Sequence, residues 1–183
     1  MEAGRQGHNL LKGAHMNHPH EINGVNVAKM LEFKGHVMKD SAKGDHNPSL
    51  VAHWVGGTRS RIELKDKVAH IGGHGEFNSM QMLLATLAAC DVDLIAIHAS
   101  FLGLQIESLS VEATGHFNLQ SYLGLEDAPA SAYDEISYVV NLSVPSATLE
   151  QIAYLRKRCE RSSPVRDSLA RTIPLKLEFK ANS

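Results

Sequence analysis

Two cysteines carry the most reactive side chains of this 183-residue chain. Cys90 lies in the middle of the apolar stretch SMQMLLATLAACDVDLIAIHASFLG, and Cys159 lies in the later stretch LEQIAYLRKRCER. A thiol attacks as its thiolate, which a nearby cation favours and an apolar environment disfavours. Cys90 therefore has two interpretations, an inert packed side chain or a nucleophile whose charge is stabilised by a cation from another part of the fold.

Arg59 and Arg61 are the candidates for that cation. Both belong to the segment GGTRSR, which we interpret as the turn of a hairpin. A guanidinium stays charged when buried, and it can pair with sulfur and hold an oxygen-rich substrate. The alternative for each arginine is a solvated turn residue without a catalytic role.

Asp91 and His98 are seven residues apart in the same apolar stretch and so share one face of a helix. We favour a buried, hydrogen-bonded pair, and a dimer contact or half of a metal site are the alternatives. The chain has 11 histidines, but His70 and His74 flank glycines without a spacing that specifies a metal. We therefore expect no metal and no cofactor. The aromatic side chains suit either the core or the apolar wall of a substrate pocket: Trp54, Phe77 and Phe101.

The elements that must position these residues follow an α+β order. The residue 79–103 stretch is a long helix, with Asn78 and Gln81 forming a capping box at its start and Gly103 ending it. Antiparallel strands are predicted before it and a β-hairpin after it, rather than the alternating units of a parallel sheet. The other predicted elements are a helix within 24–41, strands within 49–57 and 61–72, strands within 104–119 and 135–144, a second helix within 146–161 and a C-terminal strand at 173–180.

The composition fits one globular domain, which we assign to residues 23–183. Residues 1–22 are expected to be a flexible arm. This arm contains the sequence GAHM, which resembles a cloning scar and suggests that part of the arm is derived from a vector. The net charge of −2 and the scattered cations argue against nucleic acid and membrane partners. Because the sequence shows no secretory signal and no uninterrupted membrane-spanning stretch, we expect a cytoplasmic protein.

The long helix is apolar around much of its circumference, and this predicts assembly. One apolar seam contains Cys90, and a second apolar row occupies the neighbouring face. A single sheet covers only one side of such a helix. The same helix from a second copy is a simple symmetrical cover for the remaining face, so we expect a homodimer.

These motifs give the chain a resemblance to the OsmC and organic hydroperoxide resistance (Ohr) family. The resemblance extends from about Asn23 to Phe179. It implies an OsmC-like fold, an intertwined homodimer with two long helices at its centre, and an active site at the subunit interface. The segments that carry it are HWVGGTRSRIEL, NSMQMLLATLAAC, SSPVRDSLARTIPLKLEF and, for a branch with a longer hairpin, LQSYLGLEDAPASAYDEI.

The resemblance also implies an activity, the peroxiredoxin-like, thiol-dependent reduction of organic hydroperoxides in oxidative stress defence. Cys90 matches the family's peroxidatic cysteine, and Arg59 is the best match to the arginine that holds its thiolate. The implied partners are a small organic hydroperoxide, or another small apolar ligand, and a thiol reductant. The alternative is a catalytically weak dimer that binds a small apolar or thiol-containing ligand at the interface.

The chain departs from the family pattern at the residue that orients the arginine. The family has a Glu nine or ten residues before its cysteine, where this chain has Gln81 and Met80. The resemblance places Gln81 in the catalytic set, although a neutral amide orients an arginine more weakly than a carboxylate. Glu76 is an alternative, for which we prefer solvation at the helix end.

A second departure concerns the resolving cysteine. The family has a Cys-Pro motif where this chain has Ser163 before Pro164, and serine cannot resolve a sulfenic acid. Cys159 lies four residues upstream, one helical turn away, and is a candidate substitute. The alternative for Cys159 is a semi-exposed surface cysteine.

Overall fold

The computed structural model describes residues 21–181. The described chain begins with a small hairpin of β1 (Glu21–Ile22) and β2 (Val25–Asn26), followed by helix α2 (Val27–Lys39) and the 3-10 turn η1 (Ser41–Gly44). The flexible arm predicted for residues 1–22 lies outside the described residues, except for its last two, which form β1.

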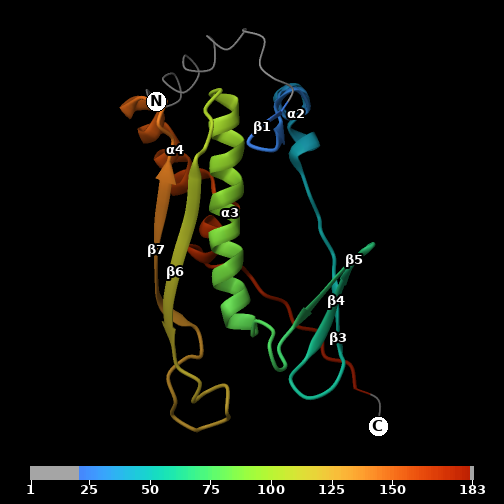
Figure 1. Cartoon of the computed structure of the whole chain (residues 1–183). Helices are drawn as coiled ribbons and strands as arrows, with labels where there is room; N and C mark the ends of the chain where they lie inside the picture. The colour runs from blue at the N-terminus through green and yellow to red at the C-terminus, as the bar shows by residue number, and fades with distance from the viewer. Residues whose placement is uncertain (1–20, 182–183) are drawn as a thin grey trace.

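Three short strands form the first of the larger sheets. They are β3 (Val51–Trp54), β4 (Ser60–Leu64) and β5 (Lys67–Ile71), paired antiparallel in the order β3-β4-β5. The antiparallel N-terminal strands predicted from the sequence are therefore confirmed. An extended segment after η1 carries this sheet away from α2, so that it lies to one side of the rest of the fold (Figure 1).

The long helix α3 (Ser79–Phe101) is the central element of the fold. Its start is the predicted capping box, in which the Gln81 N–H donates to Asn78 Oδ1 at 2.8 Å and the Asn78 N–H donates to Gln81 Oε1 at 3.0 Å. At its other end, Gly103 takes a φ of 72°, a left-handed conformation that glycine adopts without strain. The signals that predicted the bounds of this helix are thus confirmed.

The second large hairpin covers one side of α3. Its strands are β6 (Ser108–Phe117) and β7 (Tyr133–Ser143), and side-chain exposure alternates along β6 as expected when one face of a sheet is covered. Helices α4 (Leu149–Ser162) and α5 (Pro164–Leu169) follow and also pack against α3. The α+β fold class is confirmed by this arrangement (Figure 1).

The C-terminal strand predicted at 173–180 does not form in the single chain. Within the described residues, the segment after α5 has no regular secondary structure. The apolar side chains of its alternating pattern are exposed, with Leu175 at 93% and Leu177 at 90%. A strand forms only when its backbone N–H and C=O groups pair with a neighbouring edge, and this segment has no such neighbour here.

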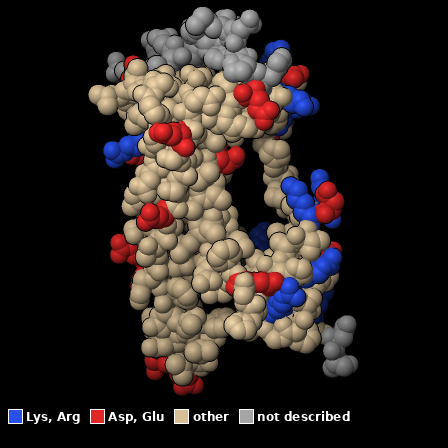
Figure 2. All heavy atoms as spheres, in the orientation of Figure 1, with Lys and Arg blue, Asp and Glu red and all other residues tan. Residues whose placement is uncertain are grey.

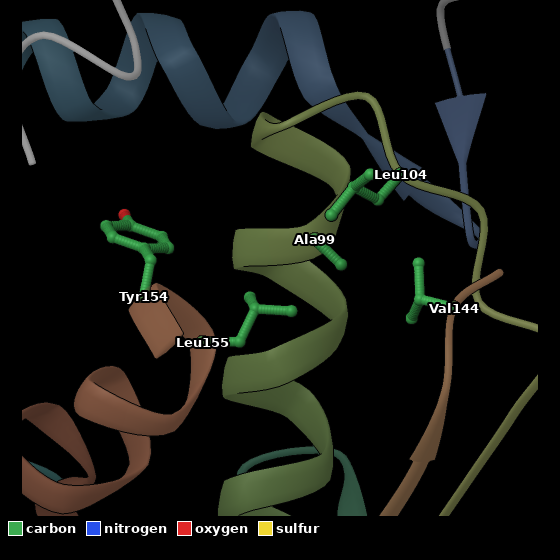
Figure 3. Close-up of a cluster of buried hydrophobic side chains, with 5 residues drawn as sticks. All are labelled: Ala99, Leu104, Val144, Tyr154 and Leu155. Carbon is green, nitrogen blue, oxygen red and sulfur yellow. The ribbon is translucent and has the colours of Figure 1, made fainter. Parts of the chain in front are cut away.

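The core lies at the upper half of α3, where α4 and the ends of the hairpin strands meet it. Figure 3 shows Leu155 and Tyr154 of α4 on one side of Ala99, and Leu104 and Val144 on the other. Each fully buried leucine or valine of such a cluster contributes about 1.5–3 kcal/mol to folding. This cluster therefore fixes α4, and with it the start of α5, against α3.

The lower part of α3 is covered less completely. Although α3 is long and apolar enough to cross a membrane by length and composition alone, only 22% of its most apolar window is buried. A helix that packs in the core of a protein passes the same test. The single chain therefore leaves part of the apolar surface of α3 exposed, as predicted for a helix that is apolar on more than one side.

Candidate active site

The Cys90 side chain is half-buried near the middle of α3. Its sulfur accepts a hydrogen bond from the Ser163 hydroxyl, with 3.4 Å between Oγ and Sγ. Ser163 is itself buried. It ends α4 and caps α5, where its hydroxyl oxygen accepts a hydrogen bond from the Arg166 N–H. The thiol of α3 is therefore in contact with the junction of α4 and α5.

The second cysteine, Cys159, lies on α4 one turn before Ser163. Its side chain is 8% exposed, so the interpretation of Cys159 as a surface residue is wrong. Burial, together with the negative charge of Asp91, raises the pKa of the Cys159 thiol to about 11. Both cysteines thus belong to the same contact region, where α4 and α5 pack against α3.

The hydrogen-bonded pair that we favoured for Asp91 and His98 does not form. His98 Nδ1 lies 2.9 Å from the Tyr154 hydroxyl, and burial lowers the pKa of His98 to about 4. Asp91 is completely buried, and neither of its carboxylate oxygens has a hydrogen-bond partner within the described residues. Seven residues correspond to about 10 Å along a helix, which is too far for these two short side chains to meet.

Arg59 and Glu76 form an ion pair near the start of α3, through two hydrogen bonds. Arg59 Nε donates to Glu76 Oε2 at 3.0 Å, and Nη2 donates to Oε1 at 2.6 Å. The hydrogen bonds raise the pKa of Arg59 and lower the pKa of Glu76. Glu76 therefore does more than solvate the helix end, and the preferred interpretation of that residue is wrong.

Gln81 takes no part in the Arg59 pair, because its side chain is used in the capping box of α3. The other candidate cation, Arg61, forms an ion pair with Glu63 of the same strand. Of the two arginines proposed from the sequence, Arg59 is thus the one held through two hydrogen bonds by a carboxylate from another segment of the chain.

Within one chain, the structure does not bring Arg59 and Cys90 together. Cys90 lies eleven residues into α3, about 16 Å along its axis from the first turn. Among residues 21–181, no hydrogen bond or ion pair joins the guanidinium to the sulfur. The described chain therefore contains two separate half-sites, the thiol region at the middle of α3 and the Arg59–Glu76 pair before its start.

An open cavity of about 380 Å³ lies near the Arg59–Glu76 pair. It is bounded by the loop before α3 and by the connection between β6 and β7, and its apolar lining residues are Met80, Phe117, Leu119 and Tyr122. The aromatic residues proposed from the sequence do not line it. Trp54 and Phe77 are exposed, and Phe101 is buried with Ile22 and Val27 in the core.

Metal-ligating side chains do not cluster in the part of the chain that the structure describes. Residues 21–181 contain no group of three or more His, Cys, Asp or Glu side chains arranged to hold a metal ion. His70 and His74 are exposed in and after β5.

Comparison with known proteins gives one family and one fold. The family model for OsmC-like protein matches residues 72–178. An OsmC like protein from Mycoplasma pneumoniae has a similar structure, with a TM-score of 0.57, 16% identity, and coverage of 69% of this chain and 89% of that chain. An OsmC-like protein of unknown function from Vibrio cholerae gives a TM-score of 0.51 at 12% identity, covering 68% and 94%.

A hypothetical protein from Aquifex aeolicus is also similar, with a TM-score of 0.56, 10% identity, and coverage of 69% of this chain and 89% of that chain. None of the curated proteins compared with the chain matches it. At these identities, the solved structures establish a shared fold and leave the chemistry to be argued from the residues of this chain.

Proposed function

This chain belongs to the OsmC-like protein family, whose model matches residues 72–178 of its 183 residues, and on that premise we propose that it reduces organic hydroperoxides with Cys90 as the nucleophile. The electrons come from thiols. In this proposal the reaction takes place in the cytoplasm and serves defence against oxidative stress.

The first step transfers one oxygen atom. The Cys90 thiolate attacks the terminal oxygen of the hydroperoxide, the O–O bond breaks, and the alkoxide leaves as an alcohol after it takes a proton. Cys90 becomes a sulfenic acid. The thiol of Cys159 then displaces hydroxide from the Cys90 sulfur to form a disulfide, and two molecules of a thiol reductant restore both cysteines.

The observation that carries this proposal is the hydrogen bond from Ser163 to the Cys90 sulfur. A cysteine that served only as packing would need no donor, and Ser163 is held in place because its backbone also joins α4 to α5. Cys90 is half-buried rather than sealed, so a small peroxide can approach its sulfur. Both features fit an attacking thiol better than an inert one.

The cation comes from a second copy of the chain in this proposal. The Arg59–Glu76 pair is preformed, and 43% of the Arg59 side chain remains exposed to a partner. Because about 16 Å of helix separates this pair from Cys90 in the same chain, a homodimer that places Arg59 of one copy beside Cys90 of the other completes the site.

Surface exposure supports a homodimer. The β3-β4-β5 sheet leaves Trp54 77% and Val68 52% exposed, so its apolar side chains lack cover in the single chain. Figure 2 shows an open gap between the β3-β4-β5 sheet, with the extended segment that leads to it, and the column formed by α3, β6 and β7. A second copy that entered this gap would cover both the sheet and the exposed side of α3.

The activity is tested by incubating the reduced protein with cumene hydroperoxide and a small dithiol. We expect hydroperoxide consumption that depends on the protein, together with a sulfenic acid at Cys90 that a cyclic 1,3-diketone traps. The Cys90→Ser variant is the control. Equal consumption by this variant and the wild type would remove the proposal and leave a ligand-binding dimer as the function to examine.

A further inference from the structure

The connection between β6 and β7, residues 118–132, is the longest segment between two paired strands in the described chain, and the proposed reaction gives it no role. Hairpin connections are usually about two to five residues long. This one is ordered by its own hydrogen bonds, from the Leu123 N–H to the Leu119 carbonyl at 2.9 Å and from the Tyr122 N–H to the Ser131 hydroxyl at 2.8 Å. An ordered connection of this length points to a function.

Tyr133, the first residue of β7, holds the connection against the start of α3. Its hydroxyl donates to the Met80 carbonyl at 2.8 Å. Its ring packs edge-on against the ring of Phe117, the last residue of β6, with 5.2 Å between the ring centroids. Gly115 leaves room for the Tyr133 ring, with which a Cβ at that position would clash. Both ends of the connection are therefore fixed near the first turn of α3.

The connection forms one wall of the open cavity of about 380 Å³ beside Arg59. Phe117, Leu119 and Tyr122 line this wall, and Met80 of α3 adds to the apolar lining. None of the residues that line the cavity carries a charged side chain. The volume lies within the range of about 300–1,000 Å³ that is usual for sites of small organic ligands. Because a charged group would give up hydration there without a counter-ion, the cavity suits an uncharged aryl or alkyl group.

The cavity adjoins the arginine that the proposed reaction places at the peroxide group. Gly73 lines the cavity and also lies against the Arg59 side chain, since a Cβ at Gly73 would lie 3.3 Å from Arg59 Cδ. The peroxide and the organic group of a hydroperoxide belong to one small molecule and bind close together. A hydroperoxide held at the Arg59 guanidinium would therefore direct its organic group to this cavity.

We propose that the β6–β7 connection selects the organic group of the hydroperoxide. Phe117, Leu119 and Tyr122 bind an uncharged aryl or alkyl group in the cavity, and Tyr133 positions these three side chains. The inference rests on the proposed function, because the substrate is the hydroperoxide that Cys90 reduces. It concerns recognition only. Hydrogen peroxide has no organic group and so gains nothing from the cavity.

Tyr122 and Leu123 form a matched pair for the test. They are neighbours in the same turn of the connection, and their side chains are 74% and 70% exposed, so neither is part of the core. Only Tyr122 lines the cavity. Its ring also has surface left to cover a ligand, which is the contact that an aromatic side chain makes at low entropic cost. Replacing either residue by Ala should leave the fold intact.

The kinetic test compares two peroxides in stopped-flow oxidation of Cys90. We expect Tyr122→Ala to lower the rate constant for cumene hydroperoxide about tenfold, as for the loss of part of an apolar pocket, and to leave that for hydrogen peroxide unchanged. Leu123→Ala should leave both rate constants unchanged. Tyr133→Phe, which removes only the hydroxyl that reaches Met80, should lower the cumene hydroperoxide rate alone. Wild-type rates in Tyr122→Ala, or an equal loss with both peroxides, would overturn the inference.

The product alcohol, 2-phenyl-2-propanol, tests binding without reaction. The protein is labelled with carbon-13 at its methionine methyl groups and titrated with the alcohol, and the Met80 signal is assigned from Met80→Leu. Because Met80 lines the cavity, we expect this signal to shift in the wild type and in Leu123→Ala. Tyr122→Ala should bind the alcohol about tenfold more weakly. A Met80 signal that the alcohol does not shift in the wild type would contradict the proposal.

Together the two measurements separate this inference from the proposed function. If the alcohol binds but neither peroxide oxidises Cys90, the proposed function fails, while the cavity stands as a site for an uncharged organic ligand. If cumene hydroperoxide oxidises Cys90 equally fast in the wild type and Tyr122→Ala, the proposed function stands and the inference fails. A lower mass of Tyr122→Ala in sedimentation equilibrium would assign Tyr122 to a contact between two copies and would also overturn the inference.

Discussion

At Arg59, the guanidinium is held by a carboxylate from the loop before α3 rather than by a residue of α3 itself. Two parallel hydrogen bonds fix both the position and the plane of the group. Gly73 contributes to this geometry, since a side chain at that position would lie 3.3 Å from Arg59 Cδ. We propose that Glu76 takes the role of orienting the arginine, which the family pattern gives to a residue of the helix.

Exchanging Glu76 for Gln separates the two candidates for this role. We expect Glu76→Gln to lower the rate of Cys90 oxidation by hydroperoxide about 10- to 100-fold, because the arginine loses a charged, two-point partner. Gln81→Ala should leave this rate near that of the wild type and lower the free energy of unfolding by about 1 kcal/mol, through loss of the capping box. Stopped-flow oxidation and urea unfolding measure the two effects, and the reverse order of sensitivity would return the role to Gln81.

At the level of elements, the loop between β5 and α3 aligns Glu76 with Arg59. Gly72 has a φ of 79°, and its N–H donates to the Phe77 carbonyl at 2.8 Å, which closes the loop. A Cβ at Gly72 would clash with the Thr58 carbonyl oxygen. The loop and the turn between β3 and β4 can therefore approach each other only if residue 72 is glycine.

Gly72→Ala and Gly75→Ala form a matched pair for testing this contact. Both glycines have positive φ, so each substitution should cost about 1–2 kcal/mol of unfolding free energy from the backbone alone. Only Gly72→Ala adds the clash with Thr58, since nothing lies within 4 Å of a Cβ at Gly75. We expect Gly72→Ala to be clearly the less stable in urea unfolding, and equal losses would show that the loop relaxes freely.

Local signals account for the elements that the sequence predicted well. The capping residues Asn78 and Gln81 and the glycine at 103 act within one or two turns, so the bounds of α3 follow from short stretches of sequence. The site depends on longer range contacts. Ser163 and Cys90 are 73 residues apart, and nothing in the spacing of either residue indicates their contact.

At the scale of the whole molecule, the C-terminal segment has the sequence pattern of a strand but does not form one in the single chain. The alternation of Leu175, Lys176, Leu177 and Glu178 is the pattern of a strand, but a pattern cannot supply the edge with which the strand pairs. The sequence pattern likewise cannot supply the contact between Arg59 and Cys90. The resemblance implied their roles, but the distance between the two side chains depends on the fold. Both discrepancies are resolved in the same way if a second copy provides the missing neighbours.

The C-terminal segment gives a direct test of assembly. We expect the wild type to have twice the 20.0 kDa mass of one chain in sedimentation equilibrium. Leu177→Asp should shift the protein toward the mass of a single chain, because a charge would enter the apolar side of the paired segment. Lys176→Asp, one residue away on the polar side, is the control. A single-chain mass for the wild type would contradict the homodimer.

Mixing two inactive variants tests whether the subunits share the active site. Cys90→Ser lacks the nucleophile and Arg59→Ala lacks the cation, so each homodimer should be inactive. If Arg59 acts across the interface, the mixed dimer contains one complete site, formed by Cys90 of the Arg59→Ala chain and Arg59 of the Cys90→Ser chain. Random reassociation after unfolding and refolding should therefore restore about a quarter of the wild-type hydroperoxide consumption. Both residues would belong to the same chain if the refolded mixture stayed inactive while its mass remained that of a dimer.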